Sequence, residues 1–335
     1  MAAARRFAEQ VDSLRRTRRI PGLAMVIIRD TTVLLAEGFG HANLERDVLV
    51  TAETPFDIAS VTKPIAAVVA LRLVEQGRLD LDRPMTSYEG FTGFCADARA
   101  AGGLFFRDYE CDRQTLTLRR VLSMTVNGMP GTRFFYNPIS YSWASRPMAQ
   151  VGGTTFSELV ATLVFAPAGM THSARLHRRL PLPPALATAL ATPYHVDSSG
   201  RVVPSDPPAL QGDGAAGGVI STAMDLARFD IALTQGRLLS ARSRELMWTP
   251  GRSPSGAVLP YGLGWYVQEY QGETLLWHSG LWEGAYSALY LRLPQRHLTM
   301  ILLANSDGVW WNNGLNEAAV HRSPFAAAFL GGFPR

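Results

Sequence analysis

The stretch that decides the fold is Phe-Asp-Ile-Ala-Ser-Val-Thr-Lys-Pro, residues 56–64. It contains Lys63, the only lysine of the chain, since the 32 basic residues are 31 arginines and this one lysine. A buried ammonium group can lose its proton, whereas a guanidinium stays charged at any working pH. A single lysine among arginines therefore indicates a chemical task that arginine cannot perform.

Ser60 lies three residues before Lys63, and the segment that follows is apolar on nearly all sides. Residues 64–73 predict a buried helix, in which Pro64 is tolerated because it falls in the first turn. A spacing of three places the side chains of Ser60 and Lys63 on one helical face. The alternative is a serine that only caps the helix beside a solvated lysine, and this stretch alone leaves both interpretations open.

Length and composition describe an ordinary globular protein. The chain of 335 residues suits one large domain or two closely packed ones, with 47% hydrophobic and 18% charged residues. The formal charge of +4 comes from scattered arginines, so nucleic-acid binding is not indicated. Residues 1–19 lack the apolar run of a secretory signal and predict a surface helix packed on the body, with a membrane-surface helix as the alternative. No stretch is long and apolar enough for a membrane span.

The cysteines and histidines give weak signals. Cys95 and Cys111 are too few for a disulfide framework, so we expect free thiols in a reducing compartment and a cytoplasmic protein, unless a leader has been removed. His172 and His177 have no neighbouring cluster of ligands, and no His-Glu-x-x-His motif occurs. We therefore expect neither a metal nor a cofactor.

The strand patterns lie at the two ends of the chain. A β-hairpin is predicted near the N-terminus, and an antiparallel meander with a final helix near the C-terminus. A lone hairpin is marginal in water, so it is expected to join the meander in one sheet. The predicted hairpin strands are 23–28 and 33–37; the meander strands are 261–270, 275–278, 286–293 and 298–304; the final helix is 313–329.

The middle of the chain has short helical patterns at 116–124 and 156–165, with loops expected at 181–184 and 198–208. The predicted fold class is α+β: an antiparallel β-sheet flanked by helices, with an inserted, mostly helical subdomain. Residues 1–84 and 209–335 would form the sheet domain and residues 85–208 the insertion, with the active site in the cleft between them.

Two further motifs would complete a serine-nucleophile site, which needs a base and donors for the oxyanion. Tyr136 lies in a loop bracketed by glycine and proline, and a neighbouring cation would lower its pKa enough to make tyrosinate a base. His278 precedes Ser279 and Gly280 at a predicted strand end, which would point the imidazole into a cleft. Each signal is weak alone, because most tyrosines and histidines are structural.

Taken together, the Ser60-x-x-Lys63 pair, Tyr136 and the His278-Ser-Gly triplet resemble the serine β-lactamase and penicillin-binding-protein-like superfamily. The best match is the class C-like branch that includes family VIII carboxylesterases and D-amino-acid peptidases. The resemblance implies that Ser60 is acylated, Lys63 helps to remove its proton, and Tyr136 is the general base that later activates the deacylating water. It also implies a cleft-lining strand at residues 278–280 and an oxyanion hole made by the backbone N–H groups of Ser60 and Leu281.

The chain departs from the family pattern at two motifs. Tyr136 is followed by Asn137 and Pro138, whereas relatives usually carry Tyr-Ser-Asn or Tyr-Ala-Asn, so Asn137 is a candidate substrate-binding residue in a shifted position. Class C lactamases carry Lys-Thr-Gly where this chain has His278-Ser-Gly, and a neutral histidine favours esters or small amides over carboxylated lactams. The Gly-rich run 212–218 lacks the ending of a phosphate loop and is expected to edge the cleft, while Trp282 and residues 310–311 are candidates for an acyl pocket.

These motifs predict a cofactor-free serine hydrolase that works through an acyl-enzyme. The expected activity is that of a carboxylesterase on short-chain acyl esters, with a small-molecule ester or amide as the partner. A β-lactamase or a D-amino-acid amidase or peptidase on the same machinery is the alternative. A catalytically impaired binding protein is the rival from another class, because the second motif is altered. The sequence does not indicate an oligomeric state.

Overall fold

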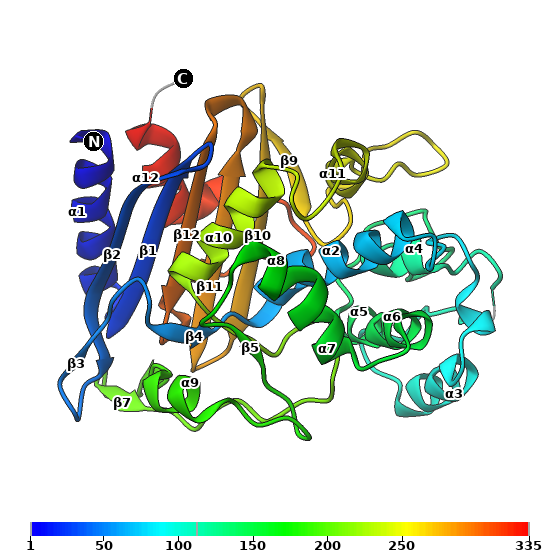
Figure 1. The fold of residues 1–335 in the computed structure, drawn as a ribbon, viewed down its shortest axis with the longest axis horizontal. Helices are drawn as coiled ribbons and strands as arrows, with labels where there is room; N and C mark the ends of the chain where they lie inside the picture. The colour runs from blue at the N-terminus through cyan, green and yellow to red at the C-terminus, as the bar shows by residue number, and fades with distance from the viewer. Residues whose placement is uncertain (1, 112, 334–335) are drawn as a thin grey trace.

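The computed structural model describes residues 2–111 and 113–333, and its centre is a seven-stranded antiparallel sheet (Figure 1). The strand order is β3-β2-β1-β12-β11-β10-β9, so the two ends of the chain meet in one sheet. The predicted α+β class with an antiparallel sheet is confirmed. The strands are β3 (Val48–Leu49), β2 (Thr32–Asn43), β1 (Gly22–Arg29), β12 (Leu298–Ala304), β11 (Tyr286–Leu293), β10 (Glu273–Trp282) and β9 (Tyr266–Tyr270).

Strand β1 joins the N-terminal hairpin to the C-terminal meander, as predicted. Met25 lies opposite Glu37 of β2 on one side and opposite Leu302 of β12 on the other. Residues 22–28 are all buried, which explains their continuous apolar sequence, because helices cover both faces of the sheet at this strand.

Helices pack on both faces of the sheet (Figure 1). Helices α1 (Ala2–Thr17) and α12 (Pro324–Gly332) pack together on one face, where the ring centroids of Phe7 and Phe329 are 5.4 Å apart. Helix α10 (Ala223–Thr234) covers the opposite face. Helix α2 (Thr62–Glu75) is almost entirely buried between the sheet and the helical part, and α11 (Ala241–Trp248) packs on it.

The middle of the chain is mostly helical, as predicted. A five-residue π-helical stretch, Ala161–Phe165, joins α7 to α8. The helices are α3 (Phe91–Ala101), α4 (Leu118–Leu122), α5 (Pro138–Trp143), α6 (Ser145–Gly152), α7 (Phe156–Val160), α8 (Ala166–Ala168) and α9 (Pro184–Ala189). No single helix among the described residues is long and apolar enough to cross a membrane; only the bent pair 138–152 and 156–168, taken together, meets that length and composition.

Two small sheets connect this helical part to the main sheet. Strand β8 (Val219–Thr222) pairs with β4 (Pro55–Asp57) on one side and with β5 (Ala174–Arg175) on the other. Strands β6 (Tyr194–Val196) and β7 (Val202–Pro204) form a hairpin, and the N–H of Tyr194 donates to the carbonyl of Asn305 beyond β12. The domain boundaries stay a prediction, but the chain already contacts the sheet part before residue 208.

Several element boundaries differ from those predicted. The final helix begins at Pro324 rather than near residue 313, because Ser323 caps it by accepting a hydrogen bond from the N–H of Ala326 at 3.4 Å. The first meander strand begins at Tyr266 rather than at residue 261, and β10 extends over residues 273–282. The two expected loops contain the start of α9 and strand β7.

The expectation of free cysteines is wrong. Cys95 in α3 forms a disulfide with Cys111, with a Cα–Cα distance of 5.8 Å. The loop after α3 folds back onto that helix, a contact that the spacing of two cysteines cannot reveal. One of the arguments for a cytoplasmic location therefore no longer holds, and the location itself stays a prediction.

We expect the disulfide to stabilise the helical part without serving the chemistry. A bridge that closes a loop of 16 residues should contribute about 2–3 kcal/mol to the free energy of unfolding. The double variant Cys95→Ala/Cys111→Ala should lose this amount in denaturant titrations. Thiol counting on the unfolded, unreduced protein is the direct check: two reactive thiols would show that the bridge does not form.

Candidate active site

Ser60 lies in the 3₁₀ turn η1 (Ala59–Val61), directly before α2. Ala59 has a φ of +46°, a left-handed conformation that non-glycine residues rarely adopt. The carboxylate of Asp57 accepts a hydrogen bond from the N–H of Ala59 at 2.8 Å. This contact fixes the turn, and thereby the direction in which Ser60 faces.

Lys63 lies in the first turn of α2, and its side chain is fully buried. Its Nζ is 2.8 Å from Oγ of Ser60 and donates to the carbonyl of Ala216 at 3.0 Å. Burial holds the pKa of Lys63 well below its ordinary value. Among the described residues no carboxylate forms an ion pair with it, so the neutral amine is favoured and can accept the Ser60 proton.

Tyr136 completes the group around Ser60. Its hydroxyl lies beside the Ser60 side chain, and its ring centroid is 5.1 Å from Nζ of Lys63. Burial raises the pKa of Tyr136 above its ordinary value, which is opposite to the lowering expected from the sequence. The physical reason is that the phenol is itself buried, which penalises the charged tyrosinate form. Tyr136 is a neutral phenol that can accept one proton and donate another.

Strand β10 passes very close to the η1 turn. A Cβ atom at Gly280 would lie 2.3 Å from the carbonyl oxygen of Ile58, so only glycine fits. This close approach brings Leu281, the next residue of β10, to the wall that Ser60 also lines. The backbone N–H groups of Ser60 and Leu281 thus stay the predicted oxyanion donors.

His278 does not line this wall. Its Nδ1 donates to the carbonyl of Ser279 at 2.7 Å, which leaves Nε2 to accept from the hydroxyl of Tyr261 at 2.9 Å. Burial lowers the pKa of His278 well below its ordinary value. The imidazole is therefore neutral and packs behind Tyr136, with a centroid distance of 6.2 Å, instead of pointing into the cleft as expected. Ser279, its neighbour on β10, does line the cavity.

Asn137 also lies outside the cavity, which differs from its predicted role in substrate binding. Its Oδ1 accepts from the N–H of Ser140 at 2.9 Å and so caps helix α5. Its Nδ2 donates to the carbonyl of Phe105 and to Oδ1 of Asn127. Its side-chain amide is thereby bound on both the oxygen and the nitrogen inside the helical part, and Pro138 takes the place beside the cavity.

The cavity in front of Ser60 has a volume of about 450 Å³ and a largely apolar wall. Trp282 and Trp310 line it, whereas Trp311 is half-buried and packs against the core, with its ring centroid 5.8 Å from that of Trp277. The Gly-rich run edges the cavity, as predicted. The wall comprises Ala59, Ser60, Lys63, Tyr136, Pro138, Ile139, Ser142, Gln211, Gly212, Gly214, Ala216, Gly217, Tyr266, Ser279, Leu281, Trp282, Trp310 and Leu315.

Arg175 was not singled out from the sequence, yet it holds the Gly-rich run in place. Its buried guanidinium donates to the carbonyls of Gly214 and Gly217 and forms an ion pair with Asp213. Between these anchored glycines lies Ala216, whose carbonyl binds Lys63. Arg175 is thus a positioning residue for the lysine, and no local pattern distinguishes it from the other arginines.

Asp57 should make stability depend on pH. Burial raises its pKa from 3.8 to about 6, so the folded protein binds this proton more tightly than the unfolded chain does. Its contribution to stability is therefore greatest at low pH and falls by roughly 3 kcal/mol as the pH rises from about 4 to about 6. Asp57→Asn keeps an oxygen for the Ala59 N–H but removes the charge. The difference in Tm, variant minus wild type, should grow over this pH range, and parallel curves would contradict the assignment.

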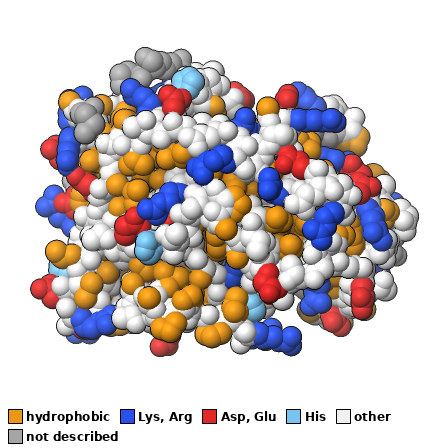
Figure 2. Space-filling view, in the orientation of Figure 1, with side chains coloured by type: hydrophobic (Ala, Val, Ile, Leu, Met, Phe, Trp, Pro, Cys, Tyr) orange, Lys and Arg blue, Asp and Glu red, His pale blue; other side chains and the backbone are white. Residues whose placement is uncertain are grey.

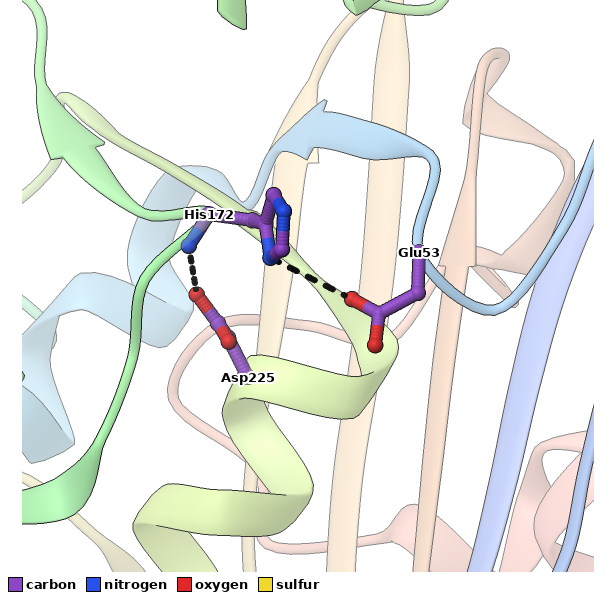
Figure 3. Close-up of side chains that lie close together, drawn as sticks. All are labelled: Glu53, His172 and Asp225. Carbon is purple, nitrogen blue, oxygen red and sulfur yellow. Dashed lines mark hydrogen bonds and ion pairs between the residues drawn. The ribbon is translucent and has the colours of Figure 1, made fainter.

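One group outside the cavity offers metal-binding atoms (Figure 3). Glu53, His172 and Asp225 place one potential ligand atom each within 4.8 Å of one another. However, Arg228 forms ion pairs with both carboxylates, and Asp225 accepts from the backbone N–H of His172 at 2.7 Å. The arginine already neutralises the charge that would attract a cation, so we assign no metal to this group.

Comparison with known proteins gives the family. Residues 4–320 match the Beta-lactamase family model, so the chain belongs to this family. It is a serine hydrolase of the penicillin-binding-protein and β-lactamase class, and the resemblance seen in the sequence is confirmed at this level.

Individual relatives are distant. Penicillin-binding protein 4* of Bacillus subtilis (strain 168) is 28% identical over an alignment covering 87% of this chain and 71% of that protein. The D-aminopeptidase of Gluconobacter oxydans (strain 621H) is 24% identical, covering 93% of this chain and 59% of that protein.

Two solved structures share the fold. The octameric penicillin-binding protein homologue from Pyrococcus abyssi superimposes with a TM-score of 0.77 at 23% identity, over 98% of this chain and 77% of that one. The D-amino acid amidase from Ochrobactrum anthropi SV3 superimposes with a TM-score of 0.74 at 18% identity, over 99% of both chains.

Proposed function

We propose that this protein hydrolyses small amides of amino acids through an acyl-enzyme on Ser60, with esters as further substrates of the same site. The observation that carries the proposal is the 2.8 Å contact between Oγ of Ser60 and Nζ of the fully buried Lys63. A serine hydroxyl becomes a nucleophile when a neighbouring base takes its proton, and a neutral amine at this distance is such a base.

The proposed reaction needs only groups of this chain. Oγ of Ser60 attacks the carbonyl carbon while its proton passes to Lys63, and the N–H groups of Ser60 and Leu281 hold the oxyanion. The intermediate collapses when the leaving amine or alkoxide receives that proton, directly or through the Tyr136 hydroxyl. Water then attacks the acyl group, its proton returns by the same route, and Ser60 is released with its hydrogen restored.

Two observations favour amides of amino acids over the simple esters expected from the sequence. One sequence relative is named D-aminopeptidase, and one solved structure that shares the fold is named D-amino acid amidase. In addition, a hollow of about 650 Å³ adjoins the cavity at Leu281 and Trp310 and is lined by Glu283 and Asp307. Arg18 shares this hollow and donates to backbone carbonyls, so two negative charges stand against one positive charge. The two carboxylates suit the ammonium group of an amino-acid amide.

A carboxylesterase that acts on short-chain acyl esters is the second candidate function. The apolar wall formed by Trp282, Trp310 and Leu315 suits an uncharged acyl chain. His278 is neutral and lies behind Tyr136, so it presents no charge to a substrate at that strand.

A comparison of substrates distinguishes the amidase hypothesis from the carboxylesterase hypothesis. Wild type and Ser60→Ala should be compared on D-phenylalanine amide, L-phenylalanine amide, p-nitrophenyl butyrate and a chromogenic cephalosporin. We expect wild type to release ammonia from the D-amide faster than from the L-amide, and Ser60→Ala to turn over none of the four. Hydrolysis of the ester alone would contradict the amidase and favour the carboxylesterase. Turnover of the cephalosporin alone would favour a lactamase.

A binding protein that has lost catalysis is tested by labelling. A fluorophosphonate reacts with an activated serine hydroxyl, so it should modify wild type at Ser60 and leave Ser60→Ala untouched. A wild type that neither reacts nor turns over any substrate would contradict the proposed hydrolase altogether.

A further inference from the structure

A second hollow, of about 720 Å³, adjoins the Ser60 cavity on the side of the helical part. Ile139, Ser142, Gly212 and Gly214 line both spaces. The dividing wall is narrow, since these residues face both spaces, and Gly214 packs closely on Ser142 within it, where a Cβ would lie 1.9 Å from Oγ of Ser142. A substrate bound at Ser60 can therefore extend past this wall into the second hollow.

The second hollow is rich in positive charge. Arg146, Arg178 and Arg179 line it, all three are exposed, and among the described residues no acidic side chain pairs with any of them. We call this space the arginine hollow. Elsewhere on the molecule the basic side chains are scattered over the visible face and often lie beside acidic ones (Figure 2).

Two of these arginines are held toward the hollow. The guanidinium of Arg146 lies 5.9 Å from the ring centroid of Trp143, which also lines the space. The backbone N–H of Arg178 donates to the carbonyl of Gln211 at 2.9 Å, and its Nη2 would lie 3.9 Å from a Cβ at Gly212. Because Gly212 belongs to the shared wall, Arg178 places its charge at the junction of the two spaces.

The acidic groups nearby are already satisfied. Asp213 lines the arginine hollow, but it accepts two hydrogen bonds from Ser157 and pairs with the buried Arg175. Glu158 caps helix α7 through Thr154 and Thr155. His177 accepts from the N–H of Arg179 at Nδ1, and its Nε2 lies 3.9 Å from Asp213. Four guanidinium groups, those of Arg175 and the three arginines, stand against these two carboxylates, so the charge around the hollow is net positive.

We propose that the arginine hollow is a subsite for an anionic group, a carboxylate in the first instance, on the part of the substrate that extends from the Ser60 cavity. Guanidinium groups bind carboxylates with paired N–H donors, and three of them around one space raise the local concentration of anions. This inference rests on the proposed function, and it assigns the recognition of charge to the helical part. The strand that carries His278 has no cation to offer.

Matched substrates test the subsite on both sides of the scissile bond. On the acyl side, 4-nitrophenyl hydrogen adipate is compared with 4-nitrophenyl hexanoate. On the leaving-group side, the dipeptide D-Phe-Gly is compared with its C-terminal amide. Each pair differs by one carboxylate, so the ratio of the two kcat/KM values reports recognition of charge alone.

The variant is Arg178→Glu/Arg179→Glu, which reverses two exposed charges. In at least one pair we expect it to reduce the ratio of anionic to neutral kcat/KM by about tenfold or more, with the neutral member changed less than about twofold. Arg6→Glu/Arg242→Glu is the control: it reverses two exposed charges on α1 and α11 and should leave both ratios unchanged. Unchanged ratios in both pairs, or an equal loss on neutral and anionic members, would overturn the proposal.

A binding measurement separates this proposal from the proposed function. Adipate is titrated calorimetrically into Ser60→Ala and into the same variant with Arg178→Glu/Arg179→Glu. Binding to the first protein only supports the subsite even where wild type shows no turnover. Equal binding of adipate to both variants, or binding to neither variant, would contradict the subsite even where wild type is an active amidase.

Discussion

Replacing Lys63 with arginine should abolish turnover, because it puts a permanently charged group where burial favours a neutral amine. Guanidinium cannot give up its proton, so it cannot accept the one from Ser60, and base assistance is usually worth about 10²-fold or more. The change in kcat/KM should therefore exceed that factor on an amide and on an ester alike. The measurement is a steady-state comparison of the purified proteins.

Arginine is larger than lysine and would be buried without a carboxylate, so Lys63→Arg can also lose activity by unfolding. Lys63→Met is the matched control, because it removes the amine and keeps an apolar stem of similar length in the same buried place. It should lose activity to a similar degree with a Tm close to that of wild type. A rate above about a tenth of wild type in either variant would exclude Lys63 as the base.

The protonation of Lys63 should also govern the pH profile. The amine works only when neutral, so kcat/KM should fall as the pH drops through its pKa. Because burial lowers that pKa, the fall should occur well below the ordinary value of 10.5. A profile that rises only near the pKa of an exposed lysine would contradict the neutral amine.

Replacing Tyr136 with phenylalanine should reduce kcat/KM by at least about 10²-fold. The change removes only the hydroxyl beside Ser60 and keeps the ring, which stacks on Tyr266 with 6.2 Å between centroids. The Tm should stay within a few degrees of wild type. Tyr270→Phe, a hydroxyl deletion on β9 outside the cavity wall, should leave both activity and Tm unchanged.

The pH profile of Tyr136→Phe separates a proton relay from a tyrosinate base. The pKa of Tyr136 is raised, so its hydroxyl stays protonated over the working range. The residual activity of the variant should therefore keep the pH midpoint of wild type. A shift of that midpoint on removal of the hydroxyl would show that ionisation of Tyr136 controls the reaction.

The parts of the fold and site that the sequence could predict are those encoded locally. Strands 286–293 and 298–304 follow from uninterrupted β-forming runs between turns, and their bounds agree with β11 and β12. The pairing of Ser60 with Lys63 follows from a spacing of three residues, which one turn of helix brings together.

The parts that could not be predicted depend on contacts between distant segments. Nothing in the sequence near Asn137 indicates that its amide nitrogen will donate to Phe105 and Asn127. Likewise, nothing near His278 indicates that its Nε2 will accept a hydrogen bond from Tyr261. The same holds for the bridge between Cys95 and Cys111. A motif gives the order of the residues along the chain, whereas the direction of each side chain is decided by partners elsewhere.

The single lysine has a practical consequence. In a folded protein whose only lysine side chain is fully buried, labelling with isotope-enriched lysine gives one side-chain signal, and that signal comes from the candidate active site. The change of its chemical shift with pH reports the protonation of Lys63, and a single signal needs no assignment experiment. Reagents that couple to amines find no ε-amino group on the surface, so modification of Lys63, located by peptide mapping, measures how often the site opens to solvent.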